Sequence, residues 1–271
     1  MRTQADKGRA FRALHERDHA FIIPNPWDVG TARLLAALGF EALATTSAGY
    51  AFSCGQRDNT VGRDRMLEHV KVVVAATDLP VSADLENGFG DTPDIVAETI
   101  RRGAAAGLAG ASIEDMSSDR DAPIYDVKLA AERIRAAAEV ARALAFTFTL
   151  TARAENFLVG RPDIKDTVKR LQAYQEAGAD VLYAPGLTSQ EDIAAIVSSV
   201  DRPVNVVMGL QGVQLSLDEL SALGVKRVSV GSSLSRAAFG AFLRAAREMR
   251  EHGTFGFAAE AVSYRELMGM F

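Results

Sequence analysis

Short apolar runs alternate with longer amphipathic segments from one end of the chain to the other. The runs are mostly apolar on both faces, as expected for parallel strands that helices cover on the outside. We expect strands at Ala20–Pro24, Ala42–Thr46, Val81–Glu86, Ala111–Glu114, Phe148–Arg153, Val181–Ala184, Val204–Val207 and Arg227–Val230. Eight strands that each precede a helical segment fit a 271-residue chain folded as a (β/α)8 TIM barrel.

The segments between the strands carry helix signals at their ends. Thr92 is a favoured N-cap residue, Pro93 suits the first helical position, and Gly39 fits the position just past a helix end. The expected helices are Asp28–Leu38, Arg63–Thr77, Pro93–Ala106, Asp126–Ala143, Asp163–Ala177, Ser189–Ser198, Ser216–Leu223 and Ser233–Arg250. An open doubly wound sheet is the alternative fold, but such sheets usually have fewer strands.

No linker or low-complexity segment divides the chain, so we expect residues 1–271 to form a single barrel domain. Residues 251–271 should form a helical tail, which is partly apolar through Phe255, Phe257, Leu267, Met268, Met270 and Phe271. This tail could pack on a neighbouring subunit, or it could cover the bottom of its own barrel.

The composition disfavours several classes of function. The net charge is −5, so there is no basic surplus for binding nucleic acid or an anionic membrane. The single cysteine, Cys54, cannot form an intrachain disulfide, which fits a reducing cytoplasm. The polar N-terminus lacks the apolar stretch of a signal peptide, and no run approaches the ~20 apolar residues of a membrane helix. We therefore expect a cytoplasmic protein that binds neither nucleic acid nor membranes.

Acidic side chains end two neighbouring strands of the expected barrel. Asp84 and Glu86 are two residues apart in the third strand, so both point to the same side. Glu114 ends the fourth strand in phase to point inward, whereas Asp115 should point the other way. Burying several carboxylates together is costly unless a cation neutralises them. Without clustered His or Cys, they favour Mg²⁺ or Mn²⁺ over zinc. The alternative for the third strand is a solvated end followed by an Asn-Gly turn.

The second and fifth strands add candidates for binding a substrate. Arg153 at the mouth of the barrel could clamp a carboxylate or stabilise developing negative charge, or it could form a salt bridge to Glu155 or to an acid of the fourth strand. Thr46, Ser47 and Ala48 follow the second strand, where small residues and exposed backbone N–H groups can hold an anion. An ordinary polar loop is the other interpretation of this segment.

Histidine chemistry is not expected at this site. None of the four histidines (His15, His19, His69 and His252) lies at the C-terminal end of a strand. Each is expected to be a surface or structural residue, which argues against a Ser-His-Asp triad and against a zinc site built on histidine. Asp58, in the segment after the second strand, could reach the surroundings of a metal.

Several motifs together resemble the isocitrate lyase/phosphoenolpyruvate mutase superfamily. Asp84-Leu85-Glu86-Asn87-Gly88-Phe89-Gly90 is similar to its D-x-D-x-G-[FY]-G metal loop, Ser112–Asp115 to its acidic strand end, and Thr151–Glu155 to its A-R-x-[DE] segment. Pro24–Asp28 and Gly39–Ala42 are similar to the first unit of that superfamily. The resemblance extends from about Phe21 to Ser233 and is specific to the superfamily, but not to one reaction.

The resemblance implies a (β/α)8 barrel, Mg²⁺ and chemistry on 2-oxo acids. It implies that Asp84, Glu86 and Glu114 hold the metal, partly through water, and that Asp58 assists. It also implies that Thr46, Ser47 and Ala48 lie where the substrate carboxylate is anchored and that Arg153 contacts the substrate. Homotetramers built from dimers that swap C-terminal helices are implied as well, which would give the apolar tail a role.

Departures from the superfamily pattern bear on the reaction. The lyases carry a cysteine motif, K-[KR]-C-G, after the fourth strand, whereas the corresponding segment Met116–Tyr125 has no cysteine. The mutase has an asparagine in this loop and a histidine after the sixth strand, and this chain has neither. Glu86 stands where aspartate is usual, which lengthens one ligand by a methylene.

These features predict an enzyme that cleaves a C–C bond of a small, oxaloacetate-like 2-oxo acid through an enolate. The metal, Arg153 and the backbone amides after the second strand could stabilise the enolate oxygen, and Tyr50, Arg120, Tyr125 or water could deliver a proton. A mutase or hydrolase of P–C bonds is one alternative. Another is a sugar-phosphate lyase that uses Gly209–Gly212 and Gly231–Ser233, and a third is a 2-oxo acid binding protein without catalysis.

Overall fold

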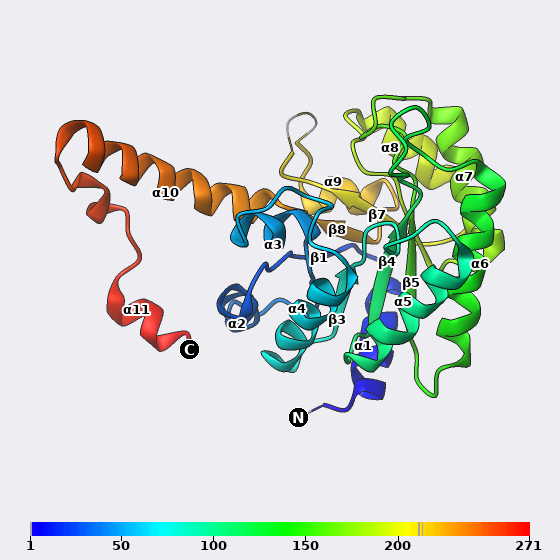
Figure 1. Cartoon of the computed structure of the whole chain (residues 1–271), viewed down its shortest axis with the longest axis horizontal. Coiled ribbons are helices and arrows are strands. Elements are labelled where there is room, and N and C mark those ends of the chain that lie inside the picture. Colours follow the sequence, from blue (N-terminus) through cyan, green and yellow to red (C-terminus); the bar gives the residue numbers. More distant parts are fainter. Residues whose placement is uncertain (1, 211, 213) are drawn as a thin grey trace.

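Eight parallel strands form a barrel in the computed structural model, which describes residues 2–210, 212 and 214–271 (Figure 1). The strands are β1 (Phe21–Ile23), β2 (Leu43–Ala44), β3 (Val81–Asp84), β4 (Gly110–Glu114), β5 (Thr149–Arg153), β6 (Val181–Tyr183), β7 (Val204–Val207) and β8 (Arg227–Ser229). They pair in the order β1-β8-β7-β6-β5-β4-β3-β2. Between β2 and β1, the N–H of Ala44 donates to the carbonyl of Pro24 at 3.1 Å and nearly closes the ring. The expected barrel is confirmed.

Helices follow the strands at the places where the sequence predicts them. They are α2 (Val29–Ala37), α4 (Arg63–Ala75), α5 (Pro93–Ala105), α6 (Val127–Ala143), α7 (Ile164–Ala177), α8 (Gln190–Ser198), α9 (Leu217–Ala222) and α10 (Ser233–His252). Asp28, Ser189 and Ser216 cap three of them by accepting hydrogen bonds from backbone N–H groups of the first turn. No helix in the described ranges is long and apolar enough to cross a membrane.

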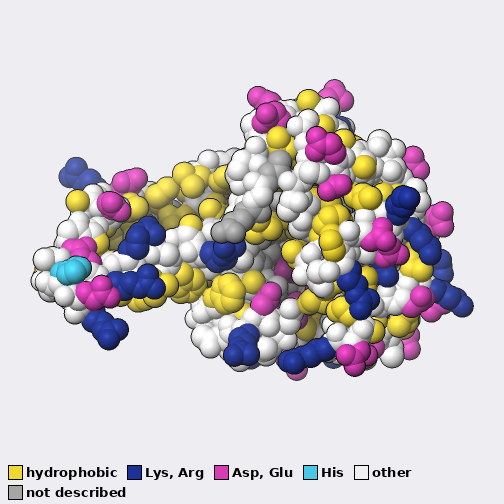
Figure 2. All heavy atoms as spheres, turned by 90° about the horizontal axis from the view of Figure 1, so that it is seen from above, with side chains coloured by type: hydrophobic (Ala, Val, Ile, Leu, Met, Phe, Trp, Pro, Cys, Tyr) yellow, Lys and Arg dark blue, Asp and Glu magenta, His cyan; other side chains and the backbone are white. Residues whose placement is uncertain are grey.

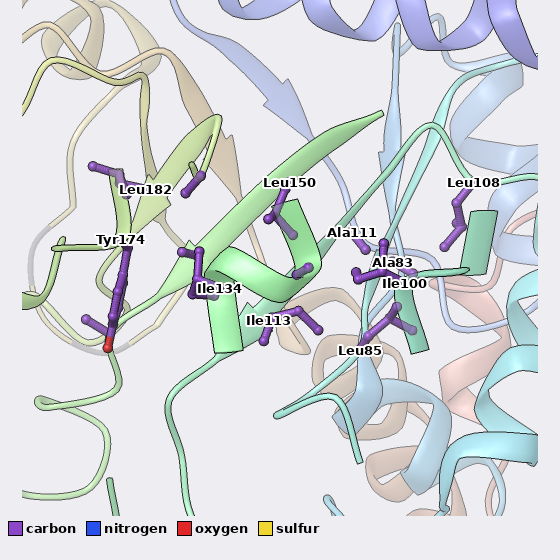
Figure 3. Close-up of a cluster of buried hydrophobic side chains, with 14 of the residues drawn as sticks. Ala83, Leu85, Ile100, Leu108, Ala111, Ile113, Ile134, Leu150, Tyr174 and Leu182 are labelled. Atoms are coloured by element: carbon purple, nitrogen blue, oxygen red, sulfur yellow. The ribbon is translucent and has the colours of Figure 1, made fainter. Parts of the chain in front are cut away.

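The inner and outer faces of the strands differ more in polarity than the sequence suggested. Outward-facing Leu85, Ile113 and Leu150 are fully buried against Ile100 of α5 and Ile134 of α6 (Figure 3). The positions between them face inward and are mostly polar, namely Ser82, Asp84, Ser112, Glu114, Thr149, Thr151, Arg153, Asn205, Arg227 and Ser229. The interpretation of these strands as apolar on both faces is therefore wrong for the inner face. The apolar core between the strands and the helices holds the strands in place, and polar side chains occupy the barrel interior.

An N-terminal helix that the sequence did not predict, α1 (Gln4–His15), packs where the strands begin. Its Phe11 is fully buried beside Phe21 of β1, with ring centroids 6.4 Å apart. Gly8 lies so close to the segment just before β5 that a Cβ atom would be 2.1 Å from the carbonyl oxygen of Thr147. This end of the barrel is therefore covered by α1 and not by residues 251–271.

The C-terminal segment projects from the barrel as an arm formed by α10, a 3₁₀ turn (Gly256–Ala259) and α11 (Tyr264–Gly269) (Figure 1). Ser235 is the single residue of α10 that is buried. Hydrophobic side chains cover part of this arm (Figure 2). Its exposed large hydrophobic residues are Leu234, Phe242, Leu243, Met249, Phe255, Val262, Tyr264, Leu267, Met268 and Phe271. Residues 251–271 contain the end of α10, the 3₁₀ turn and α11, and the arm exposes a large apolar surface.

Candidate active site at the C-terminal ends of the strands

Arg153 is the centre of a cluster of carboxylates at the C-terminal ends of β3, β4 and β5. Its Nη1 lies 2.9 Å from Oδ1 of Asp84 and 3.0 Å from Oε2 of Glu114, and its Nε donates to Oε1 of Glu155 at 2.9 Å. Parallel pairing produces this arrangement, because Glu114 of β4 lies directly beside Arg153 of β5. Both salt bridges that the sequence offered as alternatives are present, to Glu155 and to a fourth-strand acid.

The cluster carries more negative than positive charge. Glu114 and Glu155 are buried, and burial raises the pKa of both, that of Glu155 to about 7, although Arg153 opposes the rise. Burial alone would lower the pKa of Arg153, but Glu114, Glu155 and Asp84 raise it well above its ordinary value. Arg153 is therefore a permanent cation, and a second cation at this end of the barrel would be stabilised by the remaining carboxylate charge.

Glu86 is the least satisfied acid of the site. It is buried with a backbone φ of 50°, and its Oε1 has no hydrogen-bond partner in the described part of the chain. Burial, followed by the charges of Asp84 and Asp58, raises its pKa to about 8. Glu86 lines a neighbouring cavity with Asn87 and Met116, not the cavity that contains Arg153. The structure thus brings Asp84, Glu114 and Arg153 into direct contact, while Glu86 lies beside them.

The donor set suits a hard divalent cation held largely through water. An orphaned carboxylate oxygen and an excess of carboxylates are the features that such an ion would satisfy. Among residues 2–210, 212 and 214–271, no three acidic, histidine or cysteine side chains are arranged to coordinate one ion together. Mg²⁺ usually keeps several waters and takes one or two carboxylates directly, so Asp84, Glu86 and Glu114 fit it better than they would fit a fully protein-coordinated ion.

The segment after β2 forms a short helix, α3 (Ser47–Ser53), which is not among the helices that the sequence predicts. Thr46 caps it by accepting the N–H of Gly49 at 3.1 Å. Ser47 donates to Oδ2 of Asp84 through its Oγ at 2.8 Å and its backbone N–H at 3.2 Å. The backbone N–H of Ala48 lies in the first turn of α3, where N–H groups have no acceptor within the helix. Ser47 therefore contacts Asp84 directly, and all three candidate substrate-binding residues line one cavity with Asp84.

A cavity of about 220 Å³ extends from this cluster into the barrel. Thr46, Ser47, Ala48, Asp58, Asp84 and Arg153 line it, together with Asn25, Ser112, Tyr183, Asn205, Arg227 and Ser229. Asp58 is exposed at the mouth, and partial burial and the charge of Asp84 raise its pKa. The structure thus gathers six of the candidate site residues, including Asp58, around one cavity.

Four cavity residues on β6, β7 and β8 were missed by the sequence analysis, namely Tyr183, Asn205, Arg227 and Ser229. Tyr183, Asn205 and Ser229 each carry a polar group between apolar neighbours, whereas Arg227 follows Lys226 and gives no such signal. The guanidinium carbon of Arg153 lies 5.3 Å from the ring centroid of Tyr183. Burial raises the pKa of Tyr183 to about 12, so its phenol stays protonated at neutral pH.

The three side chains considered as proton donors do not line this cavity. The hydroxyl of Tyr125 donates to Oδ1 of Asp91 at 2.6 Å and accepts from the side chain of Asn87. Tyr50 stacks on His69 with ring centroids 3.7 Å apart, and Arg120 lies in the exposed loop after β4. As expected for structural histidines, His69 and His15 are buried and lie outside the carboxylate cluster.

Asp115 points away from the cavity, as the sequence predicted, and its hydrogen bonds support the backbone that carries the cluster. Its Oδ2 accepts from the hydroxyl of Tyr174 at 2.6 Å and from Nη1 of Arg170 at 3.0 Å. Its Oδ1 accepts the backbone N–H of Glu155 at 2.8 Å. Asp115 thus ties the segment that carries Arg153 and Glu155 to helix α7.

The loops considered for phosphate binding are partly occupied by the protein itself. The backbone N–H groups of Val230 and Gly231 both donate to Oδ1 of Asn25 at 2.9 Å. The hydroxyl of Ser233 donates to the carbonyl of Gly209 at 2.8 Å, and Gln211 lies outside the described residues. Two backbone N–H groups at the end of β8 therefore already have an acceptor, which disfavours the hypothesis of a sugar-phosphate lyase.

A cavity at the C-terminal ends of eight parallel strands, lined by Arg153 and by the carboxylates of Asp58 and Asp84, is typical of a (β/α)8-barrel enzyme. Comparison with known proteins then gives its family. The sequence profile of the phosphoenolpyruvate phosphomutase family matches residues 11–250, and the chain belongs to this family. The resemblance to the isocitrate lyase/phosphoenolpyruvate mutase superfamily is confirmed, and its members include lyases and mutases that act on small acids.

Two relatives match most of the chain. An uncharacterized protein of Mycobacterium tuberculosis is 32% identical over 247 residues, which is 89% of each chain. The 2-methylisocitrate lyase of Bacillus subtilis is 27% identical over 261 residues, which is 93% of this chain and 84% of that protein.

Solved structures share the whole architecture. A protein of Burkholderia cenocepacia J2315, provisionally described as a lyase or mutase, is 65% identical with a TM-score of 0.97, over 98% of this chain and 96% of its own. Oxaloacetate acetylhydrolase in complex with the product oxalate is 25% identical with a TM-score of 0.88, over 100% and 95% of the chains. Phosphonopyruvate hydrolase in complex with oxalate and Mg²⁺ is 25% identical with a TM-score of 0.86, over 99% and 95%.

Proposed function

We propose that this protein is a Mg²⁺-dependent lyase that cleaves a C–C bond of a small, oxaloacetate-like 2-oxo acid through an enolate. The observation that carries the proposal is Arg153, a buried cation that lines the cavity while it is held by Asp84, Glu114 and Glu155. Such a cation, fixed in advance, stabilises negative charge that develops on a substrate oxygen. Oxalate, which resembles the enolate of a 2-oxo acid, is bound by two of the structural neighbours.

Asp84, Glu86 and Glu114 would hold the Mg²⁺ ion, partly through water, with Mn²⁺ as an alternative. The ion would supply Lewis-acid polarisation of the 2-oxo group. Asp84 also accepts two hydrogen bonds from Ser47, which orients its carboxylate. Asp58, at the mouth of the cavity, would assist through the water around the ion.

The substrate carboxylate would be bound by Thr46, Ser47 and Ala48 opposite Arg153. The first turn of α3 presents backbone N–H groups at the cavity. Nη2 of Arg153 has no hydrogen-bond partner in the described ranges, so this group is available to a substrate oxygen. The chain therefore offers donors on two sides of a small anion.

Two other functions use the same cavity. A mutase or hydrolase acting on a phosphonopyruvate-type P–C bond is supported by the likeness to phosphonopyruvate hydrolase. A 2-oxo acid binding protein without catalysis would need the same carboxylates and Arg153. Of the described residues that line the cavity, none is a cysteine, which disfavours the cysteine-dependent lyase reactions.

The proposal is tested by turnover of oxaloacetate, phosphonopyruvate and 2-methylisocitrate with and without Mg²⁺. We expect Mg²⁺-dependent loss of an oxaloacetate-like acid, abolished by chelation and by Asp84→Ala. Asp94→Ala, which removes an exposed carboxylate on α5, should leave turnover unchanged. Turnover of phosphonopyruvate alone would replace the proposal by P–C chemistry. Mg²⁺-dependent binding of oxalate without any turnover would replace it by a binding role.

We further propose that the protein is a homotetramer, a dimer of dimers in which the C-terminal helices are exchanged between subunits. Phe242 of α10 is 65% exposed in the isolated chain, and the whole arm projects from the barrel (Figure 1). Light scattering should show four subunits for the wild type and fewer for Phe242→Asp. Leu38→Asp, at a 62% exposed position next to α2, is the matched control and should not change the assembly. A monomeric wild type would contradict this proposal.

A further inference from the structure

Arg227 is a buried arginine whose hydrogen-bond partners are all neutral. It begins β8 with its side chain inside the barrel and is 5% exposed. Its Nε donates to Oδ1 of Asn205 at 2.8 Å, and its Nη2 donates to Oγ1 of Thr151 at 3.0 Å. Its Nη1 lies 3.4 Å from Nε2 of His15. Its polar contacts fix the guanidinium in position but leave its charge uncompensated.

The third partner, His15, is neutral at physiological pH. Burial and the charge of Arg227 lower the pKa of His15 to about 3. Its Nδ1 lies 2.8 Å from the carbonyl oxygen of Phe11 and must donate to it, so Nε2 is free to accept from Arg227. Burial lowers the pKa of Arg227 only to about 10, so the guanidinium remains charged at neutral pH.

Carboxylates do not compensate this charge in the described part of the chain. No acid forms an ion pair with Arg227 there, whereas Arg153 pairs with three acids and Arg170 with two. A buried charge without a counter-charge is costly, so proteins rarely keep one without a use. The environment of Arg227 is therefore that of a binding site for an anion more than that of a structural ion pair.

The guanidinium faces the cavity of the candidate active site. Arg227, Asn205 and Ser229 line the same cavity as Asp84 and Arg153. Thr151, which holds Arg227, precedes Arg153 by two residues in β5, so the two levels are separated by roughly 7 Å along the strand. This spacing is comparable to the length of a four- or five-carbon diacid.

We propose that Arg227, with Asn205 and Ser229, binds the second carboxylate of a dicarboxylic 2-oxo acid whose first carboxylate lies between Ser47 and Arg153. The inference rests on the proposed function, whose oxaloacetate-like substrate is a four-carbon diacid, and assigns the residues that would recognise its second carboxylate. Arg227 is then a specificity-determining residue that distinguishes these diacids from 2-oxo monoacids of similar length. A merely structural role would support all ligands of the cavity equally.

The test measures binding calorimetrically in the presence of Mg²⁺ for three ligand classes. Oxalate reaches only the first carboxylate position, 2-oxobutyrate lacks a second carboxylate, and 2-oxoglutarate has one at the distal end. We expect the wild type to bind 2-oxoglutarate more tightly than 2-oxobutyrate. Arg227→Gln should lower the affinity for 2-oxoglutarate about 10- to 100-fold, as for a lost hydrogen bond to a charged group, and leave that for oxalate unchanged. Arg227→Lys should restore part of the preference because it keeps the charge.

Two results would overturn the inference. One is a wild type that binds the diacid no better than the monoacid, which can be measured even if the variants fail to fold. The other is an equal loss of oxalate and 2-oxoglutarate binding in Arg227→Gln with an unchanged melting temperature, which would indicate a structural role. A diacid preference without turnover of any acid would support the subsite and contradict the lyase reaction, so the two proposals fail separately.

Discussion

Replacing Arg153 by methionine is expected to reduce kcat/KM of the Mg²⁺-dependent reaction by at least 10²–10³-fold, the usual effect of losing one donor that stabilises an oxyanion. The same change should destabilise the fold by about 3–5 kcal/mol, because it removes the cation from a buried set of charges. Glu114 and Glu155 would then be buried without the guanidinium that now lies 3.0 and 2.9 Å from them. Enzyme assays and urea denaturation measure the two effects separately.

Controls separate the charge of Arg153 from its geometry. Arg153→Lys keeps a cation but cannot make contacts to Asp84, Glu114 and Glu155 through a planar fork, so it should recover more stability than activity. Arg101→Met removes an exposed arginine paired only with Glu98 and should change neither quantity measurably. Full activity in Arg153→Met would show that the cavity does not use this guanidinium and would remove the main support for the enolate mechanism.

The acids of the site could be predicted from the sequence because they break a strong local pattern. Asp84 and Glu114 end strands whose outward residues, such as Leu85 and Ile113, are unambiguously apolar. Period-two alternation then fixes the direction of the acids, and parallel pairing brings neighbouring strand ends together. The same rule correctly turned Asp115 outward, toward Arg170.

The rest of the cavity could not be predicted because its residues are isolated in the sequence. Asn205 lies between two valines and Arg227 begins a three-residue strand, and nothing local shows that Arg227 reaches both Asn205 and Thr151 of β5. Their contact depends on how the strands are staggered around the ring, which is a property of the closed barrel. The direction of α10 could not be predicted either. Its apolar residues indicate that the helix is buried against some surface, but they do not say which one.

Helices α1 and α3 were missed for a different reason. Both give a weak helix signal in the sequence: α1 is rich in charged side chains, and α3 is only seven residues long and contains Ser47, Gly49 and Ser53. Their stability comes from capping by Thr3 and Thr46 and from tertiary packing, not from a strong helical pattern. The consequence is functional, because α3 brings the N–H of Ser47 to Asp84.

Asp115→Ala is expected to destabilise the fold by about 3–5 kcal/mol, because it removes one of the two carboxylates that pair with the buried Arg170 and leaves further buried donors without an acceptor. Arg170, the hydroxyl of Tyr174 and the backbone N–H of Glu155 would all lose their acceptor. Asp115→Asn keeps one carbonyl oxygen for the Glu155 N–H but removes the charge that faces Arg170, so its loss of stability should be smaller. Asp126→Ala, which removes an exposed N-cap of α6, should cost only about 1 kcal/mol.

A double-mutant cycle with Arg170→Met tests the physical reason. If the cost of Asp115→Ala comes from the unpaired guanidinium, the double variant will be less destabilised than the sum of the two single variants. Additive losses would instead show that Asp166, which already pairs with Nε of Arg170 at 2.7 Å, compensates the charge without Asp115. Activity should fall in Asp115→Ala even where the protein is folded, because the backbone that Asp115 holds at Glu155 also positions Arg153. The supporting network and the catalytic cluster are thus coupled through the three-residue segment Arg153–Glu155.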